Sequence, residues 1–228
     1  MRCPVAGRNL SPSIGRIMSV RVKICGITNL ADARAAIAAG ADALGFVFVP
    51  GTPRYIAPDL AGEIVRELPP FIARVGLFVD AETRTVAEAL VRSGMDTLQF
   101  HGQETPDFVR QFRRAVKVMK AFRVRGEETL QRLPAYADAA DAILLDAYVA
   151  GAHGGTGAQF DWNLAVRARD LGRPLVLAGG LTPDNVAEAV RQVRPFAVDV
   201  SSGVESAPGK KDDAKVRAFI AAARQAST

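Results

Sequence analysis

The chain has 228 residues, of which 49% are hydrophobic and 23% are charged, a composition typical of a globular protein with a full core. The formal net charge is +5, and Arg2, Arg8 and Arg16 contribute three of these charges in the N-terminal stretch, so the remainder is only mildly basic. A nucleic-acid-binding protein needs a basic stripe and a membrane protein needs a long apolar run, and the sequence has neither. We therefore expect no nucleic acid and no membrane partner, and the charge fits a phosphorylated small molecule better.

Residues 1–18 precede the first predicted strand and contain Gly, Pro, Ser and Arg without a sustained apolar segment, which is unlike a secretory signal. We interpret them as a disordered extension or the product of an upstream start, and residues 19–228 as one domain. The two cysteines, Cys3 and Cys25, make no disulfide framework, so we expect the protein in the reducing cytoplasm.

From residue 20 onward, short β-rich runs alternate with longer amphipathic runs. The predicted strands are Arg21–Cys25, Ala43–Val49, Arg74–Val79, Thr97–His101, Val116–Phe122, Ala142–Asp146, Pro174–Ala178 and Phe196–Val200. Helical patterns lie between them, for example Leu30–Ala39, Val86–Ser93 and Asn185–Val193. The first helix has Thr28 or Asn29 as its cap, and T-P-D-N at 182–185 predicts a helix with Pro183 at its first position. Several strands are apolar throughout, which indicates burial on both faces and hence a parallel sheet.

The repeated strand–helix alternation predicts an α/β fold, a single (β/α)8 TIM barrel with parallel strands. A doubly wound sheet is the alternative, but it would stop after about five or six strands and carry a G-x-G-x-x-G turn after the first, which is absent. In a barrel, functional residues gather at the carboxyl ends of the strands. The residues that follow each predicted strand are therefore the candidates for a site.

Glycine-rich turns follow the seventh and eighth predicted strands, and they favour a phosphate site. Their residues are Gly179, Gly180, Asp199, Ser201, Ser202 and Gly203. The glycines let backbone N–H groups approach a ligand closely and the serines add hydroxyl groups, as in the usual phosphate cradle of barrel enzymes. The alternative is that the glycines only close tight turns.

Cys25 ends the first strand and Asp146 ends the sixth, on opposite sides of the predicted barrel mouth. A thiolate is a base, but a free thiol with a pKa of ~8.5 is only a few per cent ionised at neutral pH unless a helix N-terminus or a cation lowers that value. Asp146 would act as an acid only if burial kept its proton in place. Together with the phosphate turns, this pair suggests proton transfer on a sugar phosphate. Alternatively, Cys25 packs as a small apolar residue and Asp146 caps a helix or joins an ion pair.

For two further side chains the sequence allows both a functional and a purely structural role. Arg54 follows Pro53 near the mouth, where its guanidinium would clamp a carboxylate or would simply be solvated. His101 ends the fourth strand and would either titrate or remain a neutral, hydrogen-bonded histidine.

Several motifs occur in order along the chain, among them K-I-C-G-I-T (23–28), P-R-Y-I (53–56), Q-F-H-G (99–102), G-G-T-G (154–157), A-G-G-L-T-P-D-N-V (178–186) and V-D-V-S-S-G-V-E (198–205). From residue 20 to the C-terminus, this set resembles the phosphoribosylanthranilate isomerase family of tryptophan biosynthesis. The resemblance implies an Amadori rearrangement of N-(5-phosphoribosyl)anthranilate to 1-(2-carboxyphenylamino)-1-deoxyribulose 5-phosphate, with no cofactor and no metal. The partner would be this small sugar phosphate carrying an anthranilate group, and the protein would be a monomer or homodimer.

The resemblance also implies residue roles. Cys25 matches the family's general base, which removes the C2′ proton, and Asp146 matches the general acid, which protonates the furanose ring oxygen. Arg54 matches the arginine that holds the anthranilate carboxylate, and residues 155–157 belong to the mobile sixth loop. The expected substrate-binding residues are Arg54, His101, Gly155, Gly157, Gly179, Gly180, Asp199, Ser201, Ser202 and Gly203.

The chain departs from the family pattern at Thr52, Phe100 and Ala158, none of which is the expected acid or base. One rival is another sugar-phosphate isomerase of this fold, including the related histidine-pathway enzyme, which uses aspartate where Cys25 stands. A second rival is a sugar-phosphate sensor that binds without turnover, and the presence of both Cys25 and Asp146 argues against it.

Overall fold

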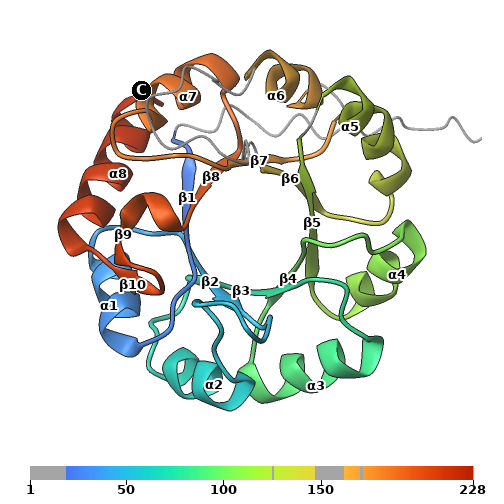
Figure 1. The fold of residues 1–228 in the computed structure, drawn as a ribbon, viewed down its shortest axis with the longest axis horizontal. Coiled ribbons are helices and arrows are strands. Elements are labelled where there is room, and N and C mark those ends of the chain that lie inside the picture. Colours follow the sequence, from blue (N-terminus) through green and yellow to red (C-terminus); the bar gives the residue numbers. More distant parts are fainter. Residues whose placement is uncertain (1–18, 125, 147–161, 170–171, 228) are drawn as a thin grey trace, which may run out of the picture.

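Eight parallel strands close into a barrel in sequence order, and helices surround it (Figure 1). This computed structural model describes residues 19–124, 126–146, 162–169 and 172–227. The expected extension over residues 1–18 and the predicted binding residues Gly155 and Gly157 lie outside the described residues. The first strand pairs with both the second and the eighth, which closes the barrel and confirms the predicted fold class.

The strands are β1 (Arg21–Cys25), β2 (Ala43–Val47), β3 (Ala73–Phe78), β4 (Thr97–Phe100), β5 (Lys117–Arg123), β6 (Ala142–Asp146), β7 (Leu175–Ala178), β8 (Ala197–Val200), β9 (Glu205–Ala207) and β10 (Lys210–Lys211). The α-helices are α1 (Leu30–Ala38), α2 (Pro58–Arg66), α3 (Thr83–Ser93), α4 (Pro106–Arg110), α5 (Glu127–Arg132), α6 (Trp162–Arg169), α7 (Val186–Val193) and α8 (Asp213–Gln225). Three 3₁₀ turns are η1 (Gln111–Arg114), η2 (Leu133–Tyr136) and η3 (Ser202–Val204). Strands β9 and β10 form an antiparallel hairpin outside the barrel.

Each barrel strand is buried on both faces, as its apolar sequence predicts. In β6, Leu144 packs among the side chains inside the barrel, whereas Ile143 and Leu145 pack in the layer between strands and helices. Successive side chains of a strand point to opposite faces, so one apolar run supplies both layers. Burying each such side chain contributes about 1.5–3 kcal/mol.

The predicted helix over Asn185–Val193 is correct to within one residue, but the prediction that Pro183 takes its first position is wrong. The helix begins at Val186 and Asn185 precedes it, so Pro183 lies in the turn before the helix and not at its first position. The Asn185 side chain accepts a hydrogen bond from the Thr182 N–H (2.8 Å) and donates one to the Gly180 carbonyl (3.0 Å). The motif therefore builds a turn that holds the loop after β7.

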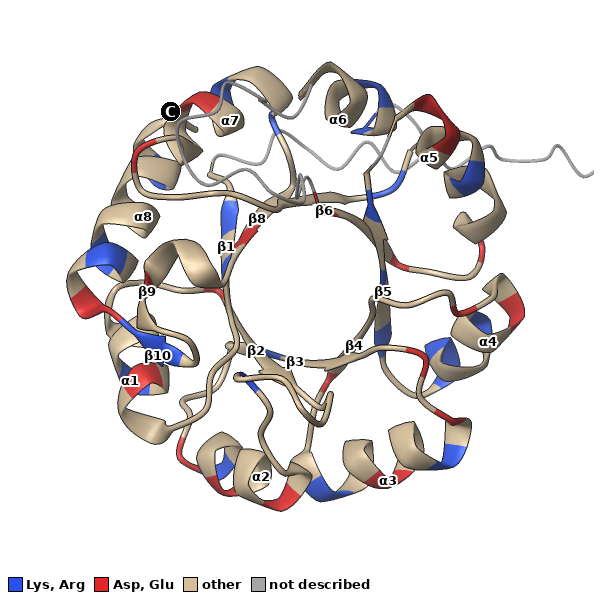
Figure 2. Cartoon of the chain, viewed as in Figure 1, with Lys and Arg blue, Asp and Glu red and all other residues tan. Residues whose placement is uncertain are grey.

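Charged side chains of both signs are interspersed around the ring of helices (Figure 2). Among the described residues, none of the helices has the length and apolarity needed to cross a bilayer.

Candidate functional site

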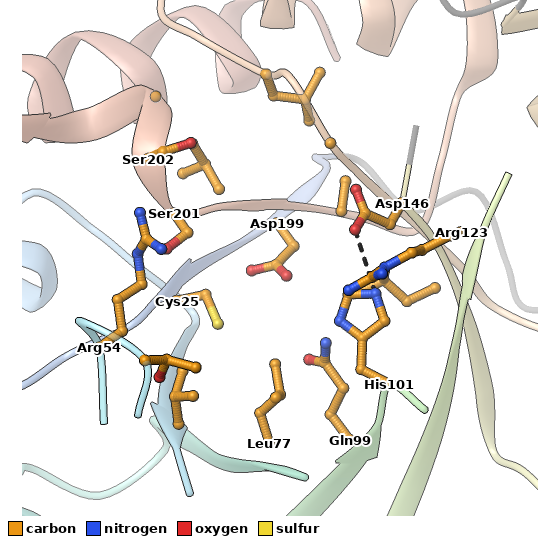
Figure 3. A pocket seen from close by; sticks show the side chains of 18 of the residues that line it. Cys25, Arg54, Leu77, Gln99, His101, Arg123, Asp146, Asp199, Ser201 and Ser202 are labelled. Carbon is orange, nitrogen blue, oxygen red and sulfur yellow. Dashed lines mark ion pairs between the residues drawn. The ribbon is translucent and has the colours of Figure 1, made fainter. Parts of the chain in front are cut away.

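A cavity of about 530 Å³ opens at the carboxyl ends of the barrel strands (Figure 3). The ten predicted site residues that the structure describes all line it: Cys25, Arg54, His101, Asp146, Gly179, Gly180, Asp199, Ser201, Ser202 and Gly203. These residues come from six different strands or the loops that follow them, and they meet because parallel barrel strands end at the same rim.

Cys25 ends β1 and forms part of the cavity floor, packed among Val47 and Leu77. The side chain is free and 5% exposed. Burial raises the pKa of the Cys25 thiol above its ordinary value, and the ammonium group of Lys23 acts against this effect. The sequence left open whether a cation approaches this thiol, and the structure identifies Lys23 as that cation.

Asp146 lies across the cavity from Cys25, at the end of β6, and its carboxylate points toward His101 (Figure 3). The Asp146 Oδ2 and His101 Nε2 atoms are 3.2 Å apart, and their side chains are 17% and 16% exposed. The carboxylate therefore reaches the cavity beside the His101 ring, whose Nε2 atom has no hydrogen-bond partner among the described residues.

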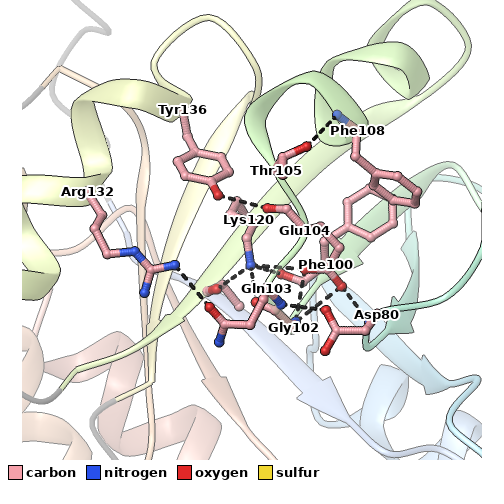
Figure 4. Close-up of polar contacts among 11 residues, drawn as sticks. Asp80, Phe100, Gly102, Gln103, Glu104, Thr105, Phe108, Lys120, Arg132 and Tyr136 are labelled. Carbon is pink, nitrogen blue, oxygen red and sulfur yellow. Dashed lines mark hydrogen bonds and ion pairs between the residues drawn. The ribbon is translucent and has the colours of Figure 1, made fainter.

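The turn between β4 and α4, which carries His101, rests on a buried ion pair (Figure 4). The Lys120 side chain is fully buried, with Nζ 3.1 Å from Glu104 Oε2 and a hydrogen bond to the Gly102 carbonyl (2.8 Å). The Glu104 carboxylate accepts hydrogen bonds from the N–H groups of Gly102 (3.0 Å) and Asp80 (2.9 Å). Burial lowers the pKa of Lys120, and Glu104 opposes this effect. These bonds fix the backbone beside His101.

Arg54 is not a solvated surface side chain. Its Nε and Nη2 atoms donate to the two carboxylate oxygens of Glu205, at 2.8 Å and 2.7 Å. Glu205 also accepts a hydrogen bond from Lys211 Nζ at 2.9 Å. The guanidinium is thus held at the rim of the cavity by a carboxylate of the chain itself, a partner that the sequence did not indicate.

The turns after β7 and β8 touch at Gly203. A Cβ on Gly203 would lie only 1.9 Å from the Leu181 carbonyl oxygen, so the close approach of the two backbones requires glycine here. Gly179 and Gly180 have positive φ angles of 85° and 64°, which glycine adopts readily. The buried Ser201 hydroxyl has no hydrogen-bond partner among the described residues. The geometry supports the predicted phosphate cradle.

Several residues of the site were missed from the sequence, namely Lys23, Gln99, Arg123 and Glu205. Gln99 lies two residues before His101 in β4, so strand alternation places both side chains on the inner face and was a usable signal. Arg123 lies one residue beyond the predicted end of its strand. Among the described residues, no group of three or more His, Cys, Asp or Glu side chains is placed to hold a metal ion.

The family model described as N-(5'phosphoribosyl)anthranilate (PRA) isomerase matches residues 22–222 of the chain. The N-(5'-phosphoribosyl)anthranilate isomerase of Geobacter sp. (strain M21) is 58% identical over 207 residues, which is 91% of this chain and 99% of the relative.

Solved structures agree with this match. One is a phosphoribosyl anthranilate isomerase in complex with reduced 1-(o-carboxyphenylamino)-1-deoxyribulose 5-phosphate, with a TM-score of 0.81 and 46% identity over 90% of this chain and 98% of that one. Another shows monomers generated from the dimeric isomerase of Thermotoga maritima, with a TM-score of 0.80 and 44% identity over 90% of this chain and 98% of that one.

Proposed function

Because the chain belongs to the N-(5'-phosphoribosyl)anthranilate isomerase family, we propose that Cys25 is the general base and Asp146 the general acid in its barrel cavity. The reaction is the Amadori rearrangement of N-(5-phosphoribosyl)anthranilate to 1-(2-carboxyphenylamino)-1-deoxyribulose 5-phosphate, a step of tryptophan biosynthesis. It moves protons within one sugar and needs an acid and a base on separate atoms.

The acid step opens the ribose ring. Asp146 gives its proton to the furanose ring oxygen as the bond from that oxygen to C1′ breaks. The lone pair of the anthranilate nitrogen, which keeps its hydrogen, forms a double bond with C1′ and gives a positively charged, protonated imine. The partly exposed carboxyl group of Asp146 at the cavity wall, 3.2 Å from His101, is placed to reach a sugar that fills the mouth. His101 lies beside this carboxyl group at the cavity wall.

The base step follows on the neighbouring carbon. The Cys25 thiolate takes the proton from C2′, and the electrons of that bond form a double bond between C1′ and C2′, which neutralises the imine. The resulting enol then becomes the ketone by moving a proton from the C2′ oxygen to C1′. Burial protects the thiolate from water but also raises the pKa of Cys25, so a nearby cation has to favour the ionised form.

Substrate contacts fall on the loops at the cavity rim, where a Cβ at Gly26 would meet both the Arg54 and the Ser201 side chains. The turns at Gly179-Gly180 and at residues 201–203 receive the phosphate through backbone N–H groups and serine hydroxyls. Arg54, fixed by Glu205, faces the anthranilate carboxylate. The ligand in the solved relative, a phosphorylated sugar with a carboxyphenylamino group, carries both anionic groups.

One observation carries the assignment of roles: Cys25 and Asp146 line opposite sides of a single cavity, with Asp199 between them in the view of Figure 3.

The test follows the loss of anthranilate-type fluorescence when phosphoribosylanthranilate, made in situ, meets the protein. We expect rapid conversion by the wild type and a fall of at least about 10³-fold for Cys25→Ala and for Asp146→Asn, because each removes a group that transfers a proton. Cys3→Ala is the matched cysteine control and should keep full activity. Near-normal turnover by Cys25→Ala or by Asp146→Asn contradicts the role given to that residue.

Two broader features belong to the same proposal. The enzyme works in the reducing cytoplasm, where the Cys25 thiol stays unoxidised. It forms a homodimer, since a relative at 44% identity is described as dimeric and the aromatic ring of Phe71 is fully exposed on this chain.

A further inference from the structure

We infer that Lys23 is a positioning residue for the base: its ammonium group, anchored by Asp199 inside the barrel, stabilises negative charge on the Cys25 sulfur. The inference deepens the proposed function and rests on it, because it explains how a buried cysteine becomes a base.

Lys23 lies in the barrel interior, directly below Cys25. The two residues are two positions apart in β1, so their side chains point to the same inner face. Cys25 and Asp199 line the cavity, whereas Lys23 is 4% exposed and lies one layer deeper along the strand. Lys23 therefore acts on substrate only through its neighbours.

The anchor of Lys23 comes from the far end of the chain. Strands β1 and β8 pair with Lys23 opposite Asp199, and Lys23 Nζ donates to Asp199 Oδ1 at 2.9 Å. Both side chains are at least nine-tenths buried. Figure 2 shows a basic segment of β1 beside an acidic segment of β8. The aspartate holds the ammonium group in the interior, where an unpaired lysine would lose its proton.

The absence of a side chain at Gly45, opposite Cys25 in β2, leaves room for both groups. A Cβ at Gly45 would lie 2.7 Å from Cys25 Sγ and 3.0 Å from Lys23 Nζ. The sulfur and the ammonium nitrogen therefore occupy the same small space above the β2 backbone.

Within the part of the chain that the structure describes, the charged groups that act on Cys25 are Lys23 in β1, Asp199 in β8, Lys211 in β10 and Arg54 after β2. Among the charges that act on Cys25, Lys23 lowers its pKa most, whereas Asp199 raises it. Asp199 and Cys25 in turn keep the pKa of Lys23 above its ordinary value in spite of burial, so Lys23 stays charged.

The other two cations near Cys25 are bound to a different anion. Arg54 makes two hydrogen bonds to Glu205, and Lys211 makes one at 2.9 Å. The single carboxylate of Glu205 holds both cations at the rim of the cavity and balances one of their two positive charges. The Lys23 ammonium nitrogen, in contrast, shares the space over Gly45 with the Cys25 sulfur.

The experiment compares Lys23→Met with the parent in a Cys3→Ser background, where Cys25 is the only thiol. The readouts are the pH dependence of Cys25 alkylation by iodoacetamide and the pH profile of kcat/KM. We expect the alkylation midpoint to rise by at least about one pH unit, which lowers the alkylation rate at neutral pH about tenfold. The value of kcat/KM should fall by a similar factor and recover partly at higher pH.

Lys120→Met is the matched control for alkylation, because it removes another fully buried ammonium group that lies in the layer outside the barrel. Its midpoint should equal that of the parent. An unchanged alkylation midpoint in Lys23→Met overturns the inference. If this variant also loses stability in urea while its midpoint stays unchanged, Lys23 has a purely structural role.

Gly45→Ala keeps the inference testable if Lys23→Met does not fold. Its added Cβ pushes the sulfur and the ammonium group apart without removing either, so the midpoint should again rise, and an unchanged midpoint counts against the inference. Alkylation needs no turnover. If Cys25→Ala kept its activity, the proposed base would be rejected. The alkylation midpoints would still test whether Lys23 stabilises the Cys25 thiolate.

Discussion

Gly203 is the residue at which the turns after β7 and β8 come into contact, and a methyl group there would overlap the Leu181 carbonyl oxygen. We predict that Gly203→Ala separates the two turns and raises KM at least about tenfold, with a smaller change in kcat, because phosphate binding is shared by ground state and transition state. The free energy of unfolding should fall by about 1–3 kcal/mol from overpacking. Steady-state kinetics and urea unfolding measure the two effects.

Gly172→Ala is the control for loss of stability without a clash between the two turns. Gly172 has a positive φ of 84°, and a Cβ there would meet nothing within 4 Å. This variant should lose about 1 kcal/mol of stability from strain alone and keep its KM. Equal KM values for the Gly203→Ala and Gly172→Ala enzymes would mean that contact between the turns does not shape the phosphate site.

At the scale of single residues, the sequence was informative wherever a side chain follows a strand. Cys25, His101 and Asp146 were predictable because parallel strands of a barrel end at the same rim. The contacts of Lys23 and Arg54 were not, because they depend on residues 176 and 151 positions away in the chain. Such pairings follow from the closure of the barrel and leave no local pattern.

At the scale of elements, the turn between β4 and α4 depends on the buried Lys120–Glu104 pair. We predict that Glu104→Gln destabilises the protein by about 3–5 kcal/mol, because it leaves the Lys120 ammonium group buried without its counter-charge. The value of kcat should fall more than KM rises, because the turn also positions His101 beside Asp146.

A double variant, Glu104→Gln with Lys120→Met, isolates the pair. Removing both charges should restore a good part of the lost stability, since no unpaired charge remains in the interior. Urea unfolding of the parent, both single variants and the double variant completes the cycle. Strict additivity of the two losses would show that the ion pair does not hold the turn.

The barrel strands were predictable because each is an apolar run between helical patterns, with ends correct to within two residues. The hairpin of β9 and β10 was not, since strands of three and two residues have no period to detect. Pro183 was wrongly placed at the first position of α7 because T-P-D-N also fits a turn in which Asn185 bonds to the Gly180 carbonyl.

At the scale of the molecule, Phe71 lies in the turn before β3, at the amino ends of the strands and away from the cavity. The ring is fully exposed, the backbone φ is 69°, and a second cavity is lined by residues around it, including Pro69 and Pro70. We predict that the dimer forms through this face, which leaves both active sites open to substrate. Light scattering should show the mass of two chains for the wild type.

Phe71→Ser should shift the protein toward monomers, because the exposed ring supplies the apolar area of the contact. The control is Val91→Ser, which removes another exposed apolar side chain, from α3. The dimer prediction fails if the wild type is a monomer at all concentrations, or if both variants dissociate equally.

The bond between Lys23 and Asp199 joins the first barrel strand to the last. During synthesis, β1 leaves the ribosome early and keeps one uncovered edge until β8 has been made. On our inference, the Lys23 ammonium group is anchored beside the Cys25 thiol only when β8 covers that edge and brings Asp199 to it. Chains cut short before β8 would therefore have no partly active barrel, and activity would report that translation and folding have reached completion.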